Sequence, residues 1–215
     1  ADSDLEQAAA TAPYGVFDNA GQDCCARSRI LVERSVHDRF LELLEPAVQG
    51  VKVKSPGEDD SEMGPLISAK QRESVRSYVE GDAVDVAFRG DAPTGAGWWY
   101  PPTVVLPKSD QDRVWREEVF GPVVAVLPFD DEADAIAKAN DTEYGLSGSI
   151  WTRDVGRALR VSRGVEAGNL SVNSHASVRY STPFGGFKQS GIGRELGPDA
   201  LDPFTDVKNI FISDE

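Results

Sequence analysis

Two adjacent thiols are the residues of this sequence best suited to covalent chemistry. Cys24 and Cys25 are its only cysteines, and the thiolate is the nucleophilic form of that side chain. The residues before them are polar or turn-forming, namely Asn19, Gly21, Gln22 and Asp23. Such a loop can hold a reactive side chain at a cleft, although an isolated cysteine is more often a small buried hydrophobic residue. The segment is therefore a candidate nucleophile loop.

Disulfide and metal chemistry are both disfavoured by the spacing. A disulfide between neighbours is strained and no third thiol exists, so we expect a reducing cytoplasm rather than a disulfide framework. A zinc site needs about four ligands at ordered spacing. His37 and His175 do not provide it together with the cysteine pair, and we predict no metal site.

A second candidate lies at Glu117 and Glu118, directly before the apolar run 119–129. Paired glutamates in this position are typical of a solvated strand entry or a helix start. The residues alone assign them no chemistry.

The elements that must position these segments alternate between helix and strand. Helical periodicity predicts helices over 4–12, 36–49, 68–81, 131–140 and 154–164. Branched or continuous apolar runs predict strands over 29–33, 84–88, 123–129, 148–152 and 169–173. This alternation predicts an α/β fold with a mostly parallel sheet and helices on both faces.

Loops interrupt this pattern in three places, over 55–65, 94–102 and 181–199. We expect the last loop to end in a short helix. Its glycines 191, 193 and 197 superficially resemble a dinucleotide fingerprint, but they neither follow a strand nor open a βαβ unit. We interpret them as a structural loop.

Size and charge limit the remaining possibilities. The 215 residues are enough for one core, which we place over 1–205, with a strand-like tail over 206–215. A net charge of −14 argues against nucleic acid or an anionic membrane as partner. No apolar run approaches the ~20 residues of a membrane span, and the acidic first residues do not resemble a secretory signal.

The motifs together resemble the aldehyde dehydrogenase family. Phe17 to Cys24 fit the pattern F-x-N-x-G-Q-x-C, and 117–123 fit E-E-x-F-G-P-V. Segments 63–68, 101–105, 140–152, 168–173 and 183–197 are similar to family segments in family order. The resemblance covers essentially the whole chain.

That resemblance implies specific roles. Cys24 would be the nucleophile, and Cys25 a structural residue or redox bystander. Glu118 would hydrogen-bond the nicotinamide ribose of NAD or NADP, with Phe120 beside the nicotinamide. The implied reaction oxidises an aldehyde to a carboxylic acid through a thiohemiacetal and a thioester on Cys24. The family's general-base glutamate and most of its cofactor-binding domain would lie upstream of Ala1.

The substrate is less clearly indicated. The resemblance places Asp23, Val178, Arg179 and Phe184 along the substrate tunnel. Asp23 resembles the residue of some aminobutyraldehyde dehydrogenases and would attract a cationic aldehyde, whereas Arg179 would favour an anionic one. Both charges could instead pair within the protein.

Two other functions stay open for this chain. A coenzyme-A-acylating relative would use the same thiol, and the isolated chain could serve as a non-enzymatic binding or oligomerising domain.

The tail has nothing evident to pair with in its own chain. Since the family's last strand joins a sheet shared between subunits, we expect a homodimer or homotetramer.

Overall fold

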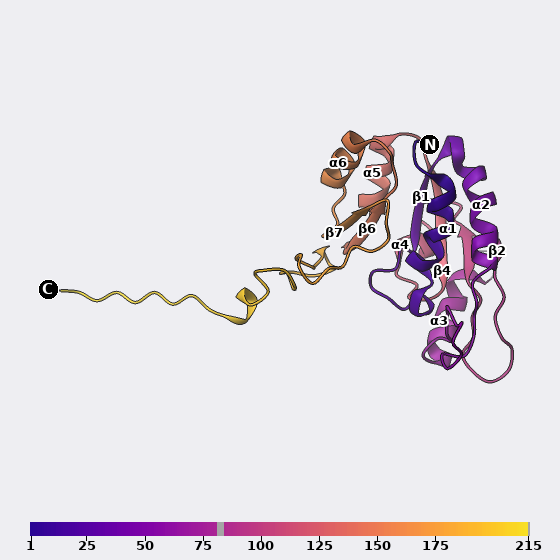
Figure 1. The fold of residues 1–215 in the computed structure, drawn as a ribbon, viewed down its shortest axis with the longest axis horizontal. Coiled ribbons are helices and arrows are strands. Elements are labelled where there is room, and N and C mark those ends of the chain that lie inside the picture. Colours follow the sequence, from indigo (N-terminus) through magenta and orange to yellow (C-terminus); the bar gives the residue numbers. More distant parts are fainter. Residues whose placement is uncertain (81–83, 215) are drawn as a thin grey trace.

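A four-stranded sheet forms the centre of the computed structural model, which describes residues 1–80 and 84–214 (Figure 1). Its strands are β1 (Arg29–Glu33), β2 (Asp85–Arg89), β3 (Thr103–Leu106) and β4 (Val123–Phe129), in the order β1-β4-β3-β2. Strands β1 and β3 both lie parallel to β4, whereas β2 is antiparallel to β3. The predicted mostly parallel sheet is confirmed.

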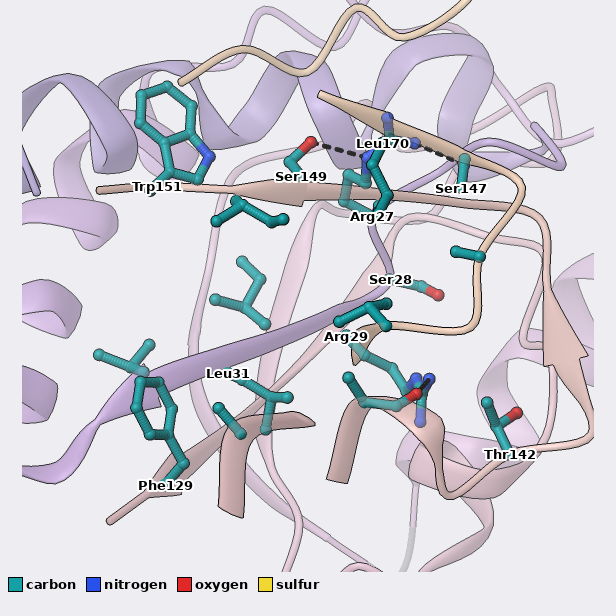
Figure 2. Close-up of a pocket in the computed structure, with 18 of the residues that line it drawn as sticks. Arg27, Ser28, Arg29, Leu31, Phe129, Thr142, Ser147, Ser149, Trp151 and Leu170 are labelled. Atoms are coloured by element: carbon teal, nitrogen blue, oxygen red, sulfur yellow. Dashed lines mark hydrogen bonds between the residues drawn. The ribbon is translucent and has the colours of Figure 1, made fainter. Parts of the chain in front are cut away.

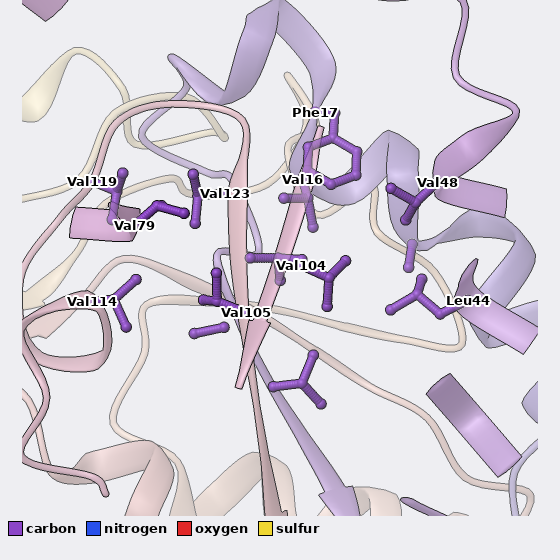
Figure 3. Close-up of a cluster of buried hydrophobic side chains, with 14 of the residues drawn as sticks. Val16, Phe17, Leu44, Val48, Val79, Val104, Val105, Val114, Val119 and Val123 are labelled. Carbon is purple, nitrogen blue, oxygen red and sulfur yellow. The ribbon is translucent and has the colours of Figure 1, made fainter. Parts of the chain in front are cut away.

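Helices cover this sheet on both faces because its central strand has no polar side. Residues 123–127 of β4 are all buried, so neighbouring side chains on opposite faces both require cover. In Figure 3, Val104 of β3 lies toward Leu44 and Val48, whereas Val105 lies toward Val114. The covering helices are α1 (Leu5–Val16), α2 (His37–Gln49), α3 (Ala69–Val79) and α4 (Arg113–Arg116).

The later part of the chain forms two smaller sheets. β6 (Ser147–Ile150) pairs in parallel with β7 (Asn169–Val172), and β5 (Tyr144–Gly145) pairs antiparallel with β8 (Phe187–Lys188). Helices α5 (Glu132–Asn140) and α6 (Val155–Gly164) pack against each other beside them. The strands over 147–172 thus form a sheet of their own instead of extending the central one.

Several element boundaries differ from the sequence predictions. Helix α1 continues through Pro13 to Val16, because burial of Val16 and Ala12 on the same face offsets the hydrogen bond that proline removes. The third predicted helix ends at Val79, and its predicted end at Gly81 lies outside the described residues. Strand β3 was not predicted, since its four residues are too few to show a period.

The expected short helix at the end of 181–199 is wrong. The segment is a turn-rich loop in which Gly193, Leu196 and Gly197 have positive φ values of 78°, 57° and 70°. These left-handed residues prevent a continuous helix, and only a 3-10 turn at Asp202–Phe204 follows. The three glycines lie in a loop, as predicted from the sequence.

The tail lies away from the body. Residues 205–214 form neither helix nor strand, and the exposed chain extends outward in Figure 1. The expected strand is therefore not formed in the single chain, and residue 215 lies outside the described part. In the described residues, none of the helices has the length and hydropathy needed to cross a bilayer.

Candidate thiol site

The loop before Cys24 is bent by three consecutive left-handed residues. Asn19, Ala20 and Gly21 have φ values of 50°, 56° and 68°. Asparagine and glycine adopt this conformation readily, whereas Ala20 stores strain. The Asn19 side chain donates to the Gln22 carbonyl at 2.9 Å, and the Gln22 amide donates to the Asn19 carbonyl at 3.1 Å. This reciprocal brace explains the asparagine and glutamine of the motif.

The two sequence motifs meet at a pair of glycines. A Cβ placed on Gly21 would lie 2.1 Å from the Gly121 carbonyl oxygen, closer than any real contact. The thiol loop therefore rests directly on the turn that follows Glu118 and Phe120. Gln22 also anchors the loop, since its Oε1 accepts from the Ile67 backbone N–H at 3.0 Å.

A cavity of about 790 Å³ brings the candidate residues together. Asp23, Cys24, Glu118 and Phe120 all line it, and it extends between strands β1 and β6 (Figure 2). Its lining does not include the other three predicted substrate residues, Val178, Arg179 and Phe184.

The Cys24 thiol is exposed and protonated at neutral pH. Partial desolvation, the adjacent Cys25 and the Asp23 carboxylate raise the pKa of Cys24 to about 11. Asp23 also accepts the Cys25 backbone N–H at 2.9 Å. Among the described residues, the Cys24 backbone N–H has no hydrogen-bond acceptor. The thiol thus needs a proton acceptor before it can attack, and a free N–H lies beside it.

Glu118 and Phe120 occupy a turn that accepts hydrogen bonds from helix α3. Phe120 has a φ of 53° and an exposed side chain. The Gln71 side chain donates to the carbonyls of Phe120 at 2.8 Å and Val119 at 3.3 Å. Within the described part of the chain, the exposed Glu118 carboxylate accepts no hydrogen bond. Sequence reasoning missed Gln71, which resembles an ordinary polar helix residue.

The other predicted substrate residues lie in an outer loop, the segment between β7 and β8. Val178 is exposed, and Arg179 donates to the Val178 carbonyl at 2.9 Å. Phe184 pairs through its backbone with Glu195. Neither Arg179 nor Asp23 forms an ion pair with any other described residue, so both charges remain available.

A buried cluster behind the thiol loop also escaped the sequence analysis. Arg27 is only 9% exposed and donates hydrogen bonds to β6 and to the segment over 175–177. Next to it, desolvation and the Arg27 charge lower the pKa of His175 to about 4, so this imidazole is neutral. Its ring lies 5.2 Å from that of Trp151. A lone arginine near the motif carries no signal that predicts its burial.

The thiols lie close to one carboxylate. Donor atoms of Asp23, Cys24 and Cys25 all lie within 4.8 Å of one another, and both cysteines are free. Three ligands from consecutive residues fall short of the about four that a structural zinc ion requires.

Similarity to known proteins agrees with this geometry. Residues 1–210 match the aldehyde dehydrogenase family. The chain is 40% identical to an aldehyde dehydrogenase of Emericella nidulans, over 97% of this chain and 43% of that protein. It is also 40% identical to betaine aldehyde dehydrogenase 2 of Rhizobium meliloti, over 99% of this chain and 45% of that protein.

Solved structures show the same fold. An aldehyde dehydrogenase of Bacillus cereus in complex with NAD+ is 39% identical with a TM-score of 0.93, covering 100% of this chain and 44% of that one. A betaine aldehyde dehydrogenase of Staphylococcus aureus in complex with NAD+ is 38% identical with a TM-score of 0.89, covering 94% and 42%. This chain spans less than half the length of these relatives, and it belongs to the aldehyde dehydrogenase family.

Proposed function

We propose that this chain is the thiol-bearing part of an enzyme that oxidises an aldehyde to a carboxylic acid with NAD or NADP. The observation that carries the proposal is the shared cavity, which is lined by Cys24, Glu118 and Phe120 alike. A nucleophile and a nicotinamide site must adjoin one another if hydride is to leave the carbon bound to sulfur.

In the proposed reaction, the Cys24 sulfur bonds to the aldehyde carbon and the carbonyl oxygen becomes an oxyanion. The backbone N–H of Cys24, which has no acceptor among the described residues, is a suitable donor to that oxygen, an interaction worth roughly 3–4 kcal/mol in such sites. Loss of hydride from the thiohemiacetal leaves a thioester. Water then attacks the thioester, which releases the carboxylic acid and restores the thiol.

The residues present fit a nicotinamide dinucleotide. The Glu118 carboxylate is exposed and unpaired within the described residues, so it is free to accept from ribose hydroxyls. Phe120 offers an exposed aromatic surface in the same turn, and Gln71 fixes that turn through two carbonyls. When bound, the nicotinamide would supply the hydride acceptor.

The raised pKa of Cys24 supports the proposal that a separate residue acts as the base. A thiol with a pKa of about 11 is rarely ionised at pH 7 and requires a base. The matched relatives are more than twice as long as this chain. We therefore place that base and most of the cofactor site in the part of the enzyme that corresponds to the additional residues of those relatives.

We further propose a cationic aldehyde as substrate. Asp23 lines the cavity next to the thiol, whereas Arg179 lies outside its lining. A carboxylate in that place attracts an ammonium group, and several relatives are named betaine aldehyde dehydrogenases. An aminoaldehyde or a quaternary ammonium aldehyde fits this charge. A reducing compartment such as the cytoplasm would keep both thiols free.

Assembly into a homodimer or homotetramer is also proposed. Four apolar residues of the tail are almost fully exposed: Val207, Ile210, Phe211 and Ile212. Pairing of this segment with another subunit would bury them and satisfy its backbone groups.

Cysteine substitution in the full-length protein tests the proposed reaction. Cys24→Ser should abolish aldehyde-dependent NADH or NADPH formation, while Cys25→Ser, the matched control, should retain most of it. Trimethylammonium acetaldehyde and an anionic semialdehyde would be compared as substrates. Full turnover by Cys24→Ser would rule out the thiol mechanism, and preference for the anion would overturn the substrate proposal.

A further inference from the structure

We propose that Arg27 is a positioning residue that holds the backbone around Cys24 in its reactive geometry and couples it to the segment over 173–178. This inference rests on the proposed function, because it assigns Arg27 a role only if Cys24 is the nucleophile. Arg27 lines the same cavity as Cys24, but its guanidinium donors all bond within the protein, and it is not proposed to touch the substrate.

The first set of contacts joins Arg27 to strand β6. Its Nε donates to the Ser149 hydroxyl at 2.9 Å, and its Nη1 donates to the Ser147 hydroxyl at 2.7 Å (Figure 2). These serines are two positions apart on a strand, so their side chains lie on the same face. The guanidinium is therefore seated along a rigid element rather than on a loop.

The second set of contacts reaches the thiol loop and the outer segment together. Nη1 also donates to the Cys25 carbonyl, directly after the nucleophile. Nη2 donates to the His175 carbonyl at 3.0 Å and to the Ser177 hydroxyl at 3.1 Å. One side chain thus bridges the residue after Cys24 to the segment that leads to Val178.

All five N–H groups of the guanidinium are used in this arrangement. An arginine has five donors in a fixed planar fork, and the five acceptors above account for each of them. Lysine has only three donors and cannot reproduce the pattern. Among the described residues Arg27 has no carboxylate within ion-pair distance, so its five hydrogen bonds, together with the longer-range attraction of Asp23, offset the cost of burying its charge.

Packing behind the loop adds a second constraint. A Cβ on Gly15 would lie 2.5 Å from the Nδ1 atom of His175, so that imidazole fills the space against the end of α1. The Arg27 backbone N–H donates to the Gly15 carbonyl at 2.7 Å. Backbone and side chain of Arg27 therefore clamp the loop from two sides, which leaves Cys24 little freedom to shift.

A purely structural role predicts a different outcome from a positioning role. If Arg27 only stabilises the fold, its loss lowers Tm but leaves the rate per folded molecule unchanged. If it positions Cys24, its loss lowers kcat for acylation more than it changes KM. A displacement of about 1 Å at a reacting group costs roughly 100-fold in rate.

The experiment compares Arg27→Ala and Arg27→Lys in the full-length protein, with aldehyde oxidation, hydrolysis of an activated ester and Tm as readouts. We expect Arg27→Ala to lose roughly 10- to 100-fold in kcat with little change in KM. Guanidinium at a non-denaturing concentration should restore part of that rate by entering the vacated space. Arg27→Lys should lie between, since it keeps the charge but loses two donors.

Arg29→Ala is the matched control for Arg27→Ala. Arg29 is also largely buried, but it donates to the Ala139 carbonyl and lies over the Trp115 ring instead of contacting the thiol loop. It should lose stability without responding to guanidinium. If Arg27→Ala does not fold, Ser177→Ala and Arg27→Lys provide the test.

Unchanged kcat in the variants that fold, with only Tm reduced, would overturn the positioning role. Failure of the proposed function is separable, because Cys24→Ser would then remain active whatever Arg27 does. An inactive Cys24→Ser together with normal Arg27 variants would reject the Arg27 inference alone.

Discussion

Gly21 and Gly121 approach so closely that the thiol loop rests directly on the turn that carries Glu118 and Phe120. Gly21 has a φ of 68°, and a Cβ on it would lie 2.1 Å from the Gly121 carbonyl oxygen. The thiol loop and the turn that carries Glu118 and Phe120 are therefore one unit. This contact, which involves no side chain, brings the loop of the proposed nucleophile against the turn of the proposed nicotinamide site.

Gly21→Ala should consequently reduce both stability and activity. The left-handed backbone alone costs about 1–3 kcal/mol for a residue with a Cβ, and the backbone collision adds to it. Gly193→Ala is the control, since Gly193 has a φ of 78° with open space around it. Urea unfolding of both variants separates the two costs, and equal losses would show that the Gly121 contact is not limiting.

Cys24 should be the thiol that reacts first because it is the more exposed of the two, although its raised pKa makes the reaction slow at neutral pH. Because its pKa is raised to about 11, alkylation by limiting iodoacetamide should accelerate steadily as pH rises from 7 toward 11. Asp23→Asn should raise the rate at pH 8 roughly fivefold, about the 1 kcal/mol Coulomb energy of two charges 4 Å apart in water. Peptide mass spectrometry identifies the adduct. Preferential labelling of Cys25, or a plateau near pH 7, would contradict this assignment.

Glu118→Gln in the full-length protein should impair hydride transfer more than ester hydrolysis. The reason is that Glu118 would place the ribose and not the aldehyde, so we expect roughly a 10- to 100-fold loss in dehydrogenase rate alone. Glu117→Gln is the matched control, because Glu117 is held by Tyr78 and Arg113. That variant should lose stability instead. Equal losses in both activities of Glu118→Gln would indicate a folding role.

His175 should make the stability of the protein depend on pH on the acid side. Its pKa is lowered from 6.5 to about 4 by desolvation and by Arg27. Between these values the unfolded chain binds the extra proton, so stability should rise as pH increases from about 4 to 6.5 and then level off. Urea midpoints across this range measure the slope. His175→Asn should make it shallower, and an unchanged slope would remove His175 as its source.

Deletion of residues 206–215 should shift the full-length protein from dimer or tetramer toward monomer or aggregate. The deleted segment contains exposed apolar residues such as Val207 and Phe211, which the rest of the described chain leaves uncovered. Light scattering measures the change. Replacing Lys208 and Asp206 with serine, which keeps the apolar positions, is the control. An unchanged oligomer after deletion would place the subunit interface on other surfaces.

The sequence by itself determined the fold class and the nucleophile candidate. Uninterrupted apolar residues over 123–127 require a strand covered on both faces, and this requirement does not depend on distant contacts. The polar, turn-forming residues before Cys24 likewise indicate a bent loop, since asparagine and glycine accept left-handed conformations locally. Local propensity also gave most helices to within a few residues.

Only the tertiary structure decided which distant residues share the cavity. Asp23, Cys24, Glu118 and Phe120 line it, although almost a hundred positions separate the two segments, while Val178 and Phe184 lie in an outer loop. Burial of Arg27 and the approach of Gly21 to Gly121 were equally invisible in the sequence. Both depend on how separate elements pack, and side-chain type alone does not specify which acceptors or carbonyls packing will bring within reach.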